Sequence, residues 1–290
     1  MSEVINVIGI SGGKDSTATA LYAFENIEEP LRFVFCDTGL ESPITYEYIE
    51  YLDGKLKELT GGGIEVIKAD FSQKMGRKRE RLIANGEAER AKHIYPTGNP
   101  FLDLCICNGR FPGSKARFCT ADLKIRPIQN FMKALALEGK TVINWSGERA
   151  EESLARSKRL VKETWFTSNN GGSASVYRPI LRWKEQDCFN KLKQFGIEPN
   201  PLYAKGFSRV GCFPCIMCRK SELQLIAETC PEVIDKIKGW EEQVSKAAAP
   251  DAFSTFFHPT KCGGGFGIEA AVEWSKTSRG GKQYQLELNE

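Results

Sequence analysis

The chain has 290 residues and a formal net charge of +3 at pH 7. This length allows one large α/β domain, or such a domain with a smaller appendage, and a charge so close to balance does not by itself indicate a nucleic-acid partner. No apolar run approaches the roughly 20 residues that span a bilayer, which excludes a helical membrane protein and predicts a soluble, cytoplasmic one with no membrane partner.

Apolar runs that suit strands alternate with helical patterns through the first two thirds of the chain. The expected strands are Val4–Ile10, Leu31–Cys36, Ile64–Ala69 and Thr141–Trp145. The first expected helix begins near Ser16. The others cover Pro43–Leu59, a basic segment around residues 74–81, Ala121–Leu137 and Glu148–Arg159. This alternation is typical of an α/β fold with a doubly wound, mostly parallel sheet, which binds ligands at the carboxyl ends of its strands.

Two stretches depart from this alternation. Residues 95–115 are rich in Pro and Gly, contain Cys105 and Cys107, and predict a long functional loop. From about Pro199 the chain becomes dense in cysteine, and one amphipathic helix is expected over about Arg219–Lys246. We therefore expect an α/β domain over residues 1–198 and a Cys-rich, mainly helical region over residues 199–290 that packs on it.

The stretch Ser-Gly-Gly-Lys-Asp-Ser-Thr at residues 11–17 directly follows the first expected strand. It fails both the Walker A pattern and the G-x-G-x-x-G dinucleotide fingerprint. Two adjacent glycines at a helix start would still let backbone amides approach an anion, with a lysine as a mobile charge and two serine hydroxyls as donors. The alternative is an ordinary glycine turn, but the complete string favours phosphate binding by Ser11, Gly12, Gly13, Lys14 and Ser16.

Two further polar groups follow expected strands. Asp37-Thr-Gly39 ends the second strand, and Gly147-Glu-Arg149 follows the strand 141–145. Because the carboxyl ends of parallel strands meet at one edge of a sheet, we expect both groups beside residues 11–17. Arg149 and Arg156 are seven residues apart on one face of the expected helix, which suits two contacts to phosphates or a nucleic-acid backbone; solvated surface charges are the alternative.

The string at residues 11–16 resembles the PP-loop of ATP pyrophosphatases, which cleave ATP between its α and β phosphates and adenylate a substrate. Further motifs at residues 35–39, 117–127, 147–153, 200–203 and 211–215 resemble the phosphoadenosine phosphosulfate reductase family. The resemblance covers most of the chain. It implies an adenine nucleotide alpha hydrolase-like fold and a nucleotide-binding role for residues 1–198.

The sulfonucleotide reductases of that family usually depart from S-G-G-K-D-S, and they attack sulfate with a cysteine near the C-terminus. Here the string is complete, and residues 276–290 contain no cysteine. The resemblance is therefore closest to the ATP-using members, such as the ATP pyrophosphatase of DNA phosphorothioation systems, in which adenylation activates an oxygen for replacement by sulfur. A sulfonucleotide reductase with Cys262 as nucleophile, and a non-catalytic nucleotide-binding or cluster-sensing subunit, are the alternatives.

The resemblance implies roles for the residues at the strand ends. Lys14 and the loop amides would hold the β and γ phosphates of ATP, with Mg²⁺ bridging them. Asp15 would bind Mg²⁺ directly or through water, unless it serves only as a carboxylate at a helix N-terminus. Asp37 and Gly39 would border the adenosine, with a plain turn as the alternative. The implied catalytic residues are Lys14, Asp15 and Arg149, and the implied nucleotide-binding residues are Ser11, Gly12, Gly13, Lys14, Asp15, Ser16, Asp37, Gly39, Gly147 and Arg156.

A C-x-x-C pair alone could be redox-active, metal-binding or incidental, and the family resemblance favours a metal centre. Cys212 and Cys215 form C-x-x-C, and Cys119 matches a cluster-binding position of the reductases, although Thr120 replaces the second cysteine of their tandem pair. Cys105 resembles another family position, and Cys218 competes with it because C-x₂-C-x₂-C occurs in ferredoxins. We expect a [4Fe–4S] cluster on Cys105, Cys119, Cys212 and Cys215, with Cys218 as the alternative fourth ligand and a structural Zn²⁺ as the alternative metal.

The resemblance leaves several partners open. They are a DNA or tRNA substrate, a cysteine desulfurase or another sulfur donor, and a second copy of the chain in a homo-oligomer.

Overall fold

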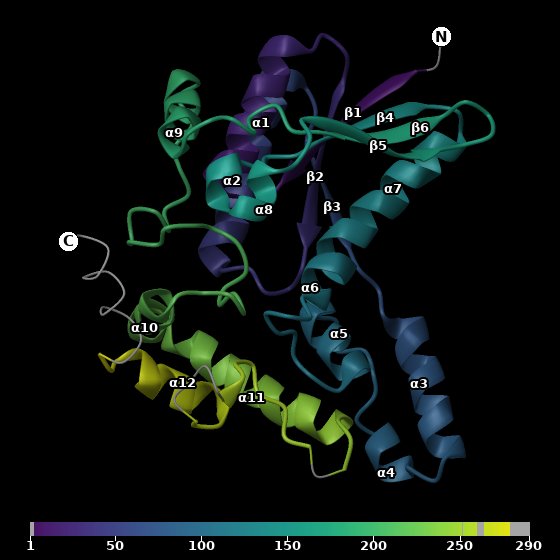
Figure 1. Ribbon diagram of the computed structural model, residues 1–290, viewed down its shortest axis with the longest axis vertical. Helices are drawn as coiled ribbons and strands as arrows, with labels where there is room; N and C mark the ends of the chain where they lie inside the picture. The colour runs from purple at the N-terminus through teal and green to yellow at the C-terminus, as the bar shows by residue number, and fades with distance from the viewer. Residues whose placement is uncertain (1–2, 251, 260–263, 279–290) are drawn as a thin grey trace. The chain divides into compact units, whose positions relative to one another are not determined.

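The computed structural model describes residues 3–250, 252–259 and 264–278 (Figure 1). The chain divides into two compact units, each of them discontinuous in sequence. The first unit contains residues 41–68, 124–211 and the described part of 1–37. The second contains residues 38–40, 69–123 and the described part of 212–290. None of the described helices is long and apolar enough to cross a membrane.

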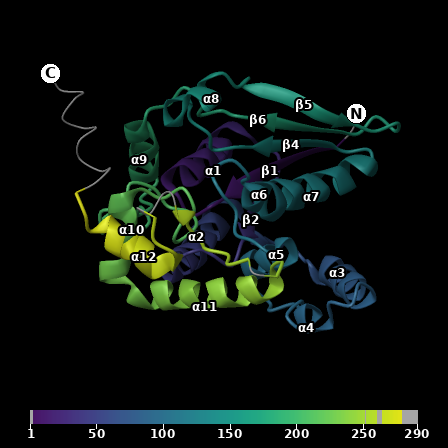
Figure 2. The same cartoon turned by 60° about the horizontal axis from the view of Figure 1, so that its bottom comes forward.

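The first unit is built on one six-stranded sheet with the order β3-β2-β1-β4-β6-β5, of which Figure 2 shows β2, β1, β4, β6 and β5 in this order. All neighbouring strands are parallel except the antiparallel pair β5–β6. This confirms the mostly parallel α/β fold. The strands are β1 Val4–Ile10, β2 Leu31–Asp37, β3 Ile64–Lys68, β4 Thr141–Trp145, β5 Lys162–Thr167 and β6 Ser173–Tyr177.

Helices cover both faces of this sheet because side chains alternate along each strand. On one face, Ile8 and Phe33 pack with side chains of α1 (Lys14–Asn26), α2 (Pro43–Thr60) and α9 (Glu185–Gln194). On the other face, Val7 and Val34 pack with Met132 and Ala136 of α7 (Arg126–Leu137). The strand order reverses between β1 and β4, and open α/β sheets bind ligands at the carboxyl ends next to such a reversal.

The expected helix over Glu148–Arg159 was wrong. A single 3₁₀ turn covers Ala150–Glu152, and α8 covers only Leu154–Ser157. Ser153 breaks the helix between them because its backbone is extended, with φ −171°, and its side chain accepts a hydrogen bond from the Arg156 amide as the cap of α8. Arg149 and Arg156 therefore do not share one helical face.

The second unit is helical and surrounds one apolar core. Residues 69–123 were expected in the first domain, but their apolar side chains pack in the same core as those of residues 212–278. The division of the chain therefore differs from the expected boundary at residues 198/199. The helices are α3 Ser72–Ala84, α4 Ala88–Ala91, α5 Pro100–Asn108, α6 Phe118–Thr120, α10 Lys220–Thr229, α11 Pro231–Ala247 and α12 Gly267–Ser275, and a π-helical turn, Ala121–Ile125, joins α6 to α7.

Two sequence predictions in this unit were wrong. The expected functional loop at residues 95–115 contains the buried helix α5, whose N-terminus is capped by the Asn99 side chain. The expected single helix over Arg219–Lys246 is two helices, because Pro231 cannot continue α10 and instead begins α11.

Candidate functional site

Residues 11–13 form a tight turn between the carboxyl end of β1 and the N-terminus of α1. Gly12 has φ +72°, and a Cβ there would come within 3.0 Å of the Thr45 side chain, so the turn requires glycine. Ser16 closes the turn: its hydroxyl accepts hydrogen bonds from the Ser11 amide at 3.1 Å and donates to the Gly13 carbonyl at 3.0 Å. The first amides of α1 have no acceptor within the helix, which suits an anion. We call residues 11–16 the phosphate loop.

The Lys14 side chain is only 4% exposed, and its ammonium is paired. Lys14 Nζ lies 2.9 Å from Glu185 Oε1 and 5.0 Å from the ring centroid of Tyr203. Phe189, one turn after Glu185 on α9, places its ring on the same ammonium at 5.7 Å. Burial lowers the pKa of Lys14, but Tyr203 and the carboxylates of Glu185 and Asp15 outweigh it and raise the pKa above its ordinary value.

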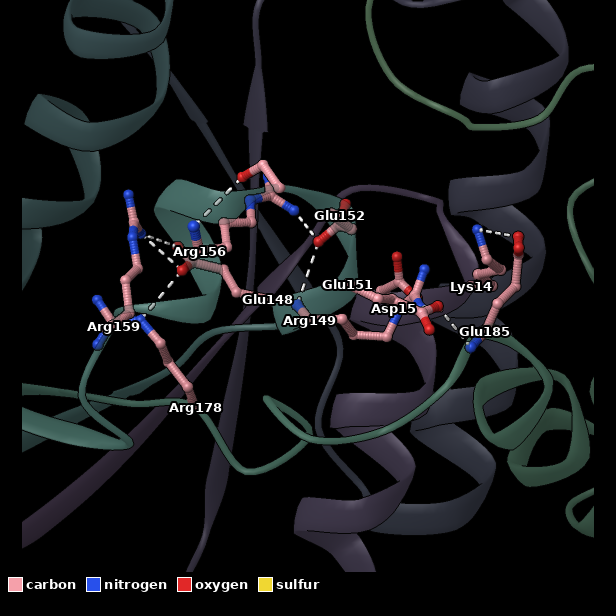
Figure 3. Close-up of polar contacts among 11 residues, drawn as sticks. Lys14, Asp15, Glu148, Arg149, Glu151, Glu152, Arg156, Arg159, Arg178 and Glu185 are labelled. Carbon is pink, nitrogen blue, oxygen red and sulfur yellow. Dashed lines mark hydrogen bonds and ion pairs between the residues drawn. The ribbon is translucent and has the colours of Figure 1, made fainter. Parts of the chain in front are cut away.

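Arg149 joins the end of β4 to the phosphate loop (Figure 3). Its Nε lies 2.7 Å from Asp15 Oδ1, and its Nη1 contacts the carboxylate of Glu151. Glu151 also accepts the backbone N–H of Glu185 at 2.9 Å. A ring of contacts thus runs from Lys14 through Glu185, Glu151 and Arg149 to Asp15, with the Glu185 backbone N–H as the link to Glu151. Both Lys14 and Arg149 are therefore paired with carboxylates of the protein.

Gly147 allows the segment after β4 to approach the phosphate loop. A Cβ at Gly147 would lie 2.8 Å from the Asp15 carbonyl oxygen and 3.0 Å from the Ser16 nitrogen. Real Cβ atoms do not come this close to backbone atoms, so only glycine fits. The expected proximity of Gly147 and Arg149 to the loop is therefore found in the structure.

Arg156 belongs to a second group of charges beside this ring (Figure 3). It contacts Glu152 across one turn, while Glu148 binds Arg159 at 2.5 Å and Arg178 at 3.1 Å. Burial, together with the neighbouring guanidinium of Arg159, lowers the pKa of Arg156. Arg156 is thus paired with Glu152 of the preceding 3₁₀ turn, whereas Arg149 is paired with Asp15 and Glu151.

Asp37 ends β2 and is buried with a second carboxylate. Tyr46 from α2 donates its hydroxyl to Asp37 Oδ1 at 2.7 Å and contacts Glu41 Oε2 at 3.2 Å, and Lys68 Nζ lies 2.7 Å from Asp37 Oδ2. Burial and these two carboxylates raise the pKa of Tyr46. Gly39 belongs to the second unit, where its carbonyl accepts a hydrogen bond from Asn99 at 2.7 Å.

The comparisons with known proteins identify a family for this chain. The family model described as the phosphoadenosine phosphosulfate reductase domain matches residues 5–218 of the chain. The chain belongs to this family. Its members include enzymes, so the family and fold are enzymatic.

Three relatives show the range of similarity. The chain is 40% identical to the uncharacterised 37.8 kDa protein in the gpa 5′ region of Escherichia phage 186, over 313 aligned positions that cover 97% of this chain and 91% of that one. It is 27% identical to an adenosine 5′-phosphosulfate reductase of Allochromatium vinosum, over 70% of this chain and 64% of that one. The crystal structure of phosphoadenylyl-sulfate reductase from Candida auris aligns with a TM-score of 0.43 and 16% identity, over 74% of this chain and 83% of that one.

The cysteines that resemble cluster-binding positions of the family all lie in the second unit. Cys105 of α5 is fully buried, and Cys119, Cys212, Cys215 and Cys218 are partly buried against the same apolar core. Burial and the neighbouring thiols of Cys119 and Cys107 raise the pKa of Cys105 well above its usual range. Among the residues that the structure describes, no three His, Cys, Asp or Glu side chains are arranged to hold a metal ion. Cys262 lies outside the described residues.

Three residues of the site were missed by sequence reasoning. Glu185 binds the Lys14 ammonium, Tyr203 accepts the Lys14 amide, and Asn200 donates to the Gly12 carbonyl. The family resemblance marked residues 200–203, but it assigned them no role. Glu185 begins an ordinary surface helix, and no local signal distinguishes it from other acidic residues in a first helical turn.

Proposed function

We propose that the chain is a PP-loop ATP pyrophosphatase that activates a nucleic acid or nucleotide by adenylation for sulfur transfer. The observation that carries the proposal is the complete phosphate loop at the carboxyl end of β1, with a buried Lys14 and the Arg149–Asp15 pair beside it. A lysine and a helix N-terminus, both at a sheet edge where ligands bind, suit the pyrophosphate end of ATP.

In the proposed reaction, an acceptor oxygen attacks the α phosphorus of ATP. The new O–P bond forms as the bond to the β-phosphate oxygen breaks, and pyrophosphate leaves. Lys14 and the loop amides bind the phosphates that leave, so they stabilise negative charge where it develops. Arg149 keeps the Asp15 carboxylate in place, and Asp15 supplies an oxygen ligand of the kind that Mg²⁺ prefers. Bound Mg²⁺ would neutralise phosphate charge.

A metal centre in the second unit is the other part of the proposal. Thiolates suit an iron–sulfur cluster or Zn²⁺, and Cys105, Cys119, Cys212, Cys215 and Cys218 all pack on one core, which also contains Cys107. Cys215 Sγ already accepts the Met217 amide at 3.4 Å, a contact that tunes metal-bound sulfur. We assign a [4Fe–4S] cluster to Cys105, Cys119, Cys212 and Cys215, with Cys218 as the competing fourth ligand and Zn²⁺ as the competing metal.

Pyrophosphate release tests the main proposal. Anaerobically purified protein is incubated with MgATP and either DNA or tRNA, alone and with a cysteine desulfurase as sulfur donor. We expect pyrophosphate that depends on the acceptor, and AMP only when the sulfur donor displaces it from the adenylated acceptor; both should be lost in Lys14→Ala. No pyrophosphate with any acceptor, combined with sulfite formation from phosphoadenosine phosphosulfate and thioredoxin, would replace the proposal with the reductase activity of the family. Full biological activity of Lys14→Ala in cells would instead favour a non-catalytic subunit.

The metal proposal has its own measurement. We expect a brown protein with iron and sulfide in equal amounts, and loss of iron in Cys105→Ser but not in Cys218→Ser. Iron loss in Cys218→Ser alone would assign the fourth position to Cys218. A colourless protein that contains zinc would remove the cluster.

A further inference from the structure

The segment Asn200–Tyr203 contacts both sides of the phosphate loop. Asn200 is buried, and its Nδ2 donates to the Gly12 carbonyl at 3.2 Å. Its Oδ1 accepts the Leu202 amide at 3.0 Å. The second bond can be made only by the oxygen of the side-chain amide, so the two bonds together determine which way the Asn200 side chain faces.

The Asn200 contact sets the orientation of one peptide group. A trans peptide is planar, and its C=O and N–H point in opposite directions. Because Asn200 holds the Gly12 carbonyl, the Gly13 N–H must point away from Asn200. Gly12 reaches this orientation through a positive φ that other residues rarely adopt.

Tyr203 sets the orientation of the next peptide group, the one between Gly13 and Lys14. Its hydroxyl accepts the Lys14 N–H at 3.0 Å. By the same geometry, the Gly13 carbonyl points the opposite way, into α1, where it accepts from the Thr17 amide at 3.1 Å and the Ser16 hydroxyl at 3.0 Å. The Tyr203 ring also lies 5.0 Å from Lys14 Nζ and packs edge-on against Phe189, which keeps the phenol in place.

We propose that Asn200 and Tyr203 are positioning residues for the phosphate loop. They hold the Gly12–Gly13 and Gly13–Lys14 peptide groups in one orientation before any ligand binds. Two adjacent glycines would otherwise sample many orientations, and ordering them would weaken anion binding. The inference rests on the proposed function in one respect, since it takes the phosphates of ATP as the anion.

The test compares two tyrosines that make the same kind of bond. Tyr203→Phe removes the hydroxyl that accepts the Lys14 amide and keeps the ring. Tyr51→Phe is the matched control, because the Tyr51 hydroxyl accepts the Glu198 amide at 3.1 Å away from the loop. Equilibrium binding to the full-length variants is measured with MgATP, inorganic pyrophosphate and AMP.

We expect Tyr203→Phe to weaken MgATP and pyrophosphate binding by roughly fivefold, the effect of one net hydrogen bond, and to leave AMP binding unchanged. Tyr51→Phe should change the binding of none of the three ligands. Asn200→Asp keeps the bond to Leu202 and loses the donor to Gly12. Because its negative charge would weaken anion binding by itself, this variant is compared by hydrogen–deuterium exchange. Hydrogen–deuterium exchange of ligand-free protein should be faster across residues 11–17 in Tyr203→Phe and in Asn200→Asp, and unchanged in Tyr51→Phe.

The outcomes separate this inference from the proposed function. Wild-type protein that binds neither MgATP nor pyrophosphate would contradict the proposed function, while faster exchange in Tyr203→Phe would still support the positioning role. Unchanged exchange in Tyr203→Phe would overturn the positioning role. Tighter pyrophosphate binding by Tyr203→Phe would also overturn it, because the Tyr203 hydroxyl would then compete with the anion for the Lys14 amide.

Discussion

Arg149 Nε lies 2.7 Å from Asp15 Oδ1, although the two residues are 134 positions apart in the chain. The Arg149 side chain is 5% exposed, and the bond ties the segment after β4 to the phosphate loop. Arg149→Gln leaves the carboxylates of Asp15 and Glu151 without their cation. We expect it to lower the free energy of unfolding by about 2 kcal/mol, somewhat less than for a fully buried pair.

Urea unfolding measures this effect. Arg159→Gln is the control, because the Arg159 side chain is 45% exposed and its pair with Glu148 should contribute less than about 1 kcal/mol. An equal loss of unfolding free energy in the two variants would show that the Arg149–Asp15 pair contributes no more to stability than the Arg159–Glu148 pair.

Glu185 holds the Lys14 ammonium that ATP phosphates would need. Because the carboxylate competes with phosphate oxygens for the same cation, we expect Glu185→Gln to tighten MgATP binding by about two- to fivefold, the effect of a partly exposed ion pair. Glu25→Gln is the control, since Glu25 binds Lys191 of the same helix α9. Weaker MgATP binding by Glu185→Gln in titration calorimetry would mean that Glu185 supports the lysine.

Gly147→Ala should damage the site through sterics alone. The new Cβ would approach the Asp15 carbonyl to 2.8 Å, so the segment after β4 must move away from the loop. We expect a lower melting temperature and weaker MgATP binding. Gly54→Ala is the control and should raise stability instead. Nothing lies within 4 Å of a Cβ at that position in α2, and alanine favours a helix over glycine by about 1 kcal/mol. A Gly147→Ala variant as stable as wild type would contradict the close approach.

Burial predicts the order in which thiols react in metal-free, folded protein. Cys105 is fully buried and the pKa of its thiol is raised, whereas Cys215 and Cys218 are partly exposed. Because alkylation requires an accessible thiolate, iodoacetamide should label Cys215 and Cys218 well before Cys105. Mass spectrometry of digested protein gives the order. Reconstitution of a cluster should then protect Cys215 from iodoacetamide and leave Cys218 reactive. In metal-free protein, early labelling of Cys105 would contradict its burial.

Lys78 gives the stability of the second unit a pH dependence. Its Nζ donates to the carbonyls of Ile106 and Cys107 at 3.0 Å, and burial lowers its pKa from 10.5 to about 8. Between these two values the unfolded chain binds more protons than the folded protein, so the contribution of Lys78 to stability increases as pH rises through this window.

The matched variant is Lys78→Met, which keeps the length of the side chain. Urea unfolding at about pH 7 and about pH 10 should show wild type gaining up to about 1 kcal/mol relative to the variant, after allowance for solvent screening. A constant difference between the two proteins would mean that the pKa of Lys78 is not lowered.

Local patterns determined the elements around the loop. Thr141–Trp145 and Val4–Ile10 are strands as expected, and a helix follows residues 11–13, because apolar periodicity and glycine chemistry act within a few residues. The same patterns could not reveal the break at Ser153, where a side-chain cap starts a new helix in place of a continuous one.

Only the tertiary structure decided which side chains meet at the site. Lys14 and Tyr203 are 189 residues apart, and Gly12 and Asn200 are 188 apart. Residues 69–123 likewise pack in one core with the C-terminal helices, because their apolar side chains are buried there. In the sequence, the two segments are separated by residues 124–211 of the first unit. Periodicity indicates that a residue is buried or lies at a strand end, but its partner is chosen by packing between elements. The sequence by itself thus determined a tight glycine turn between a strand and a helix, and the fold supplied the carboxylates, the amide and the phenol that contact it.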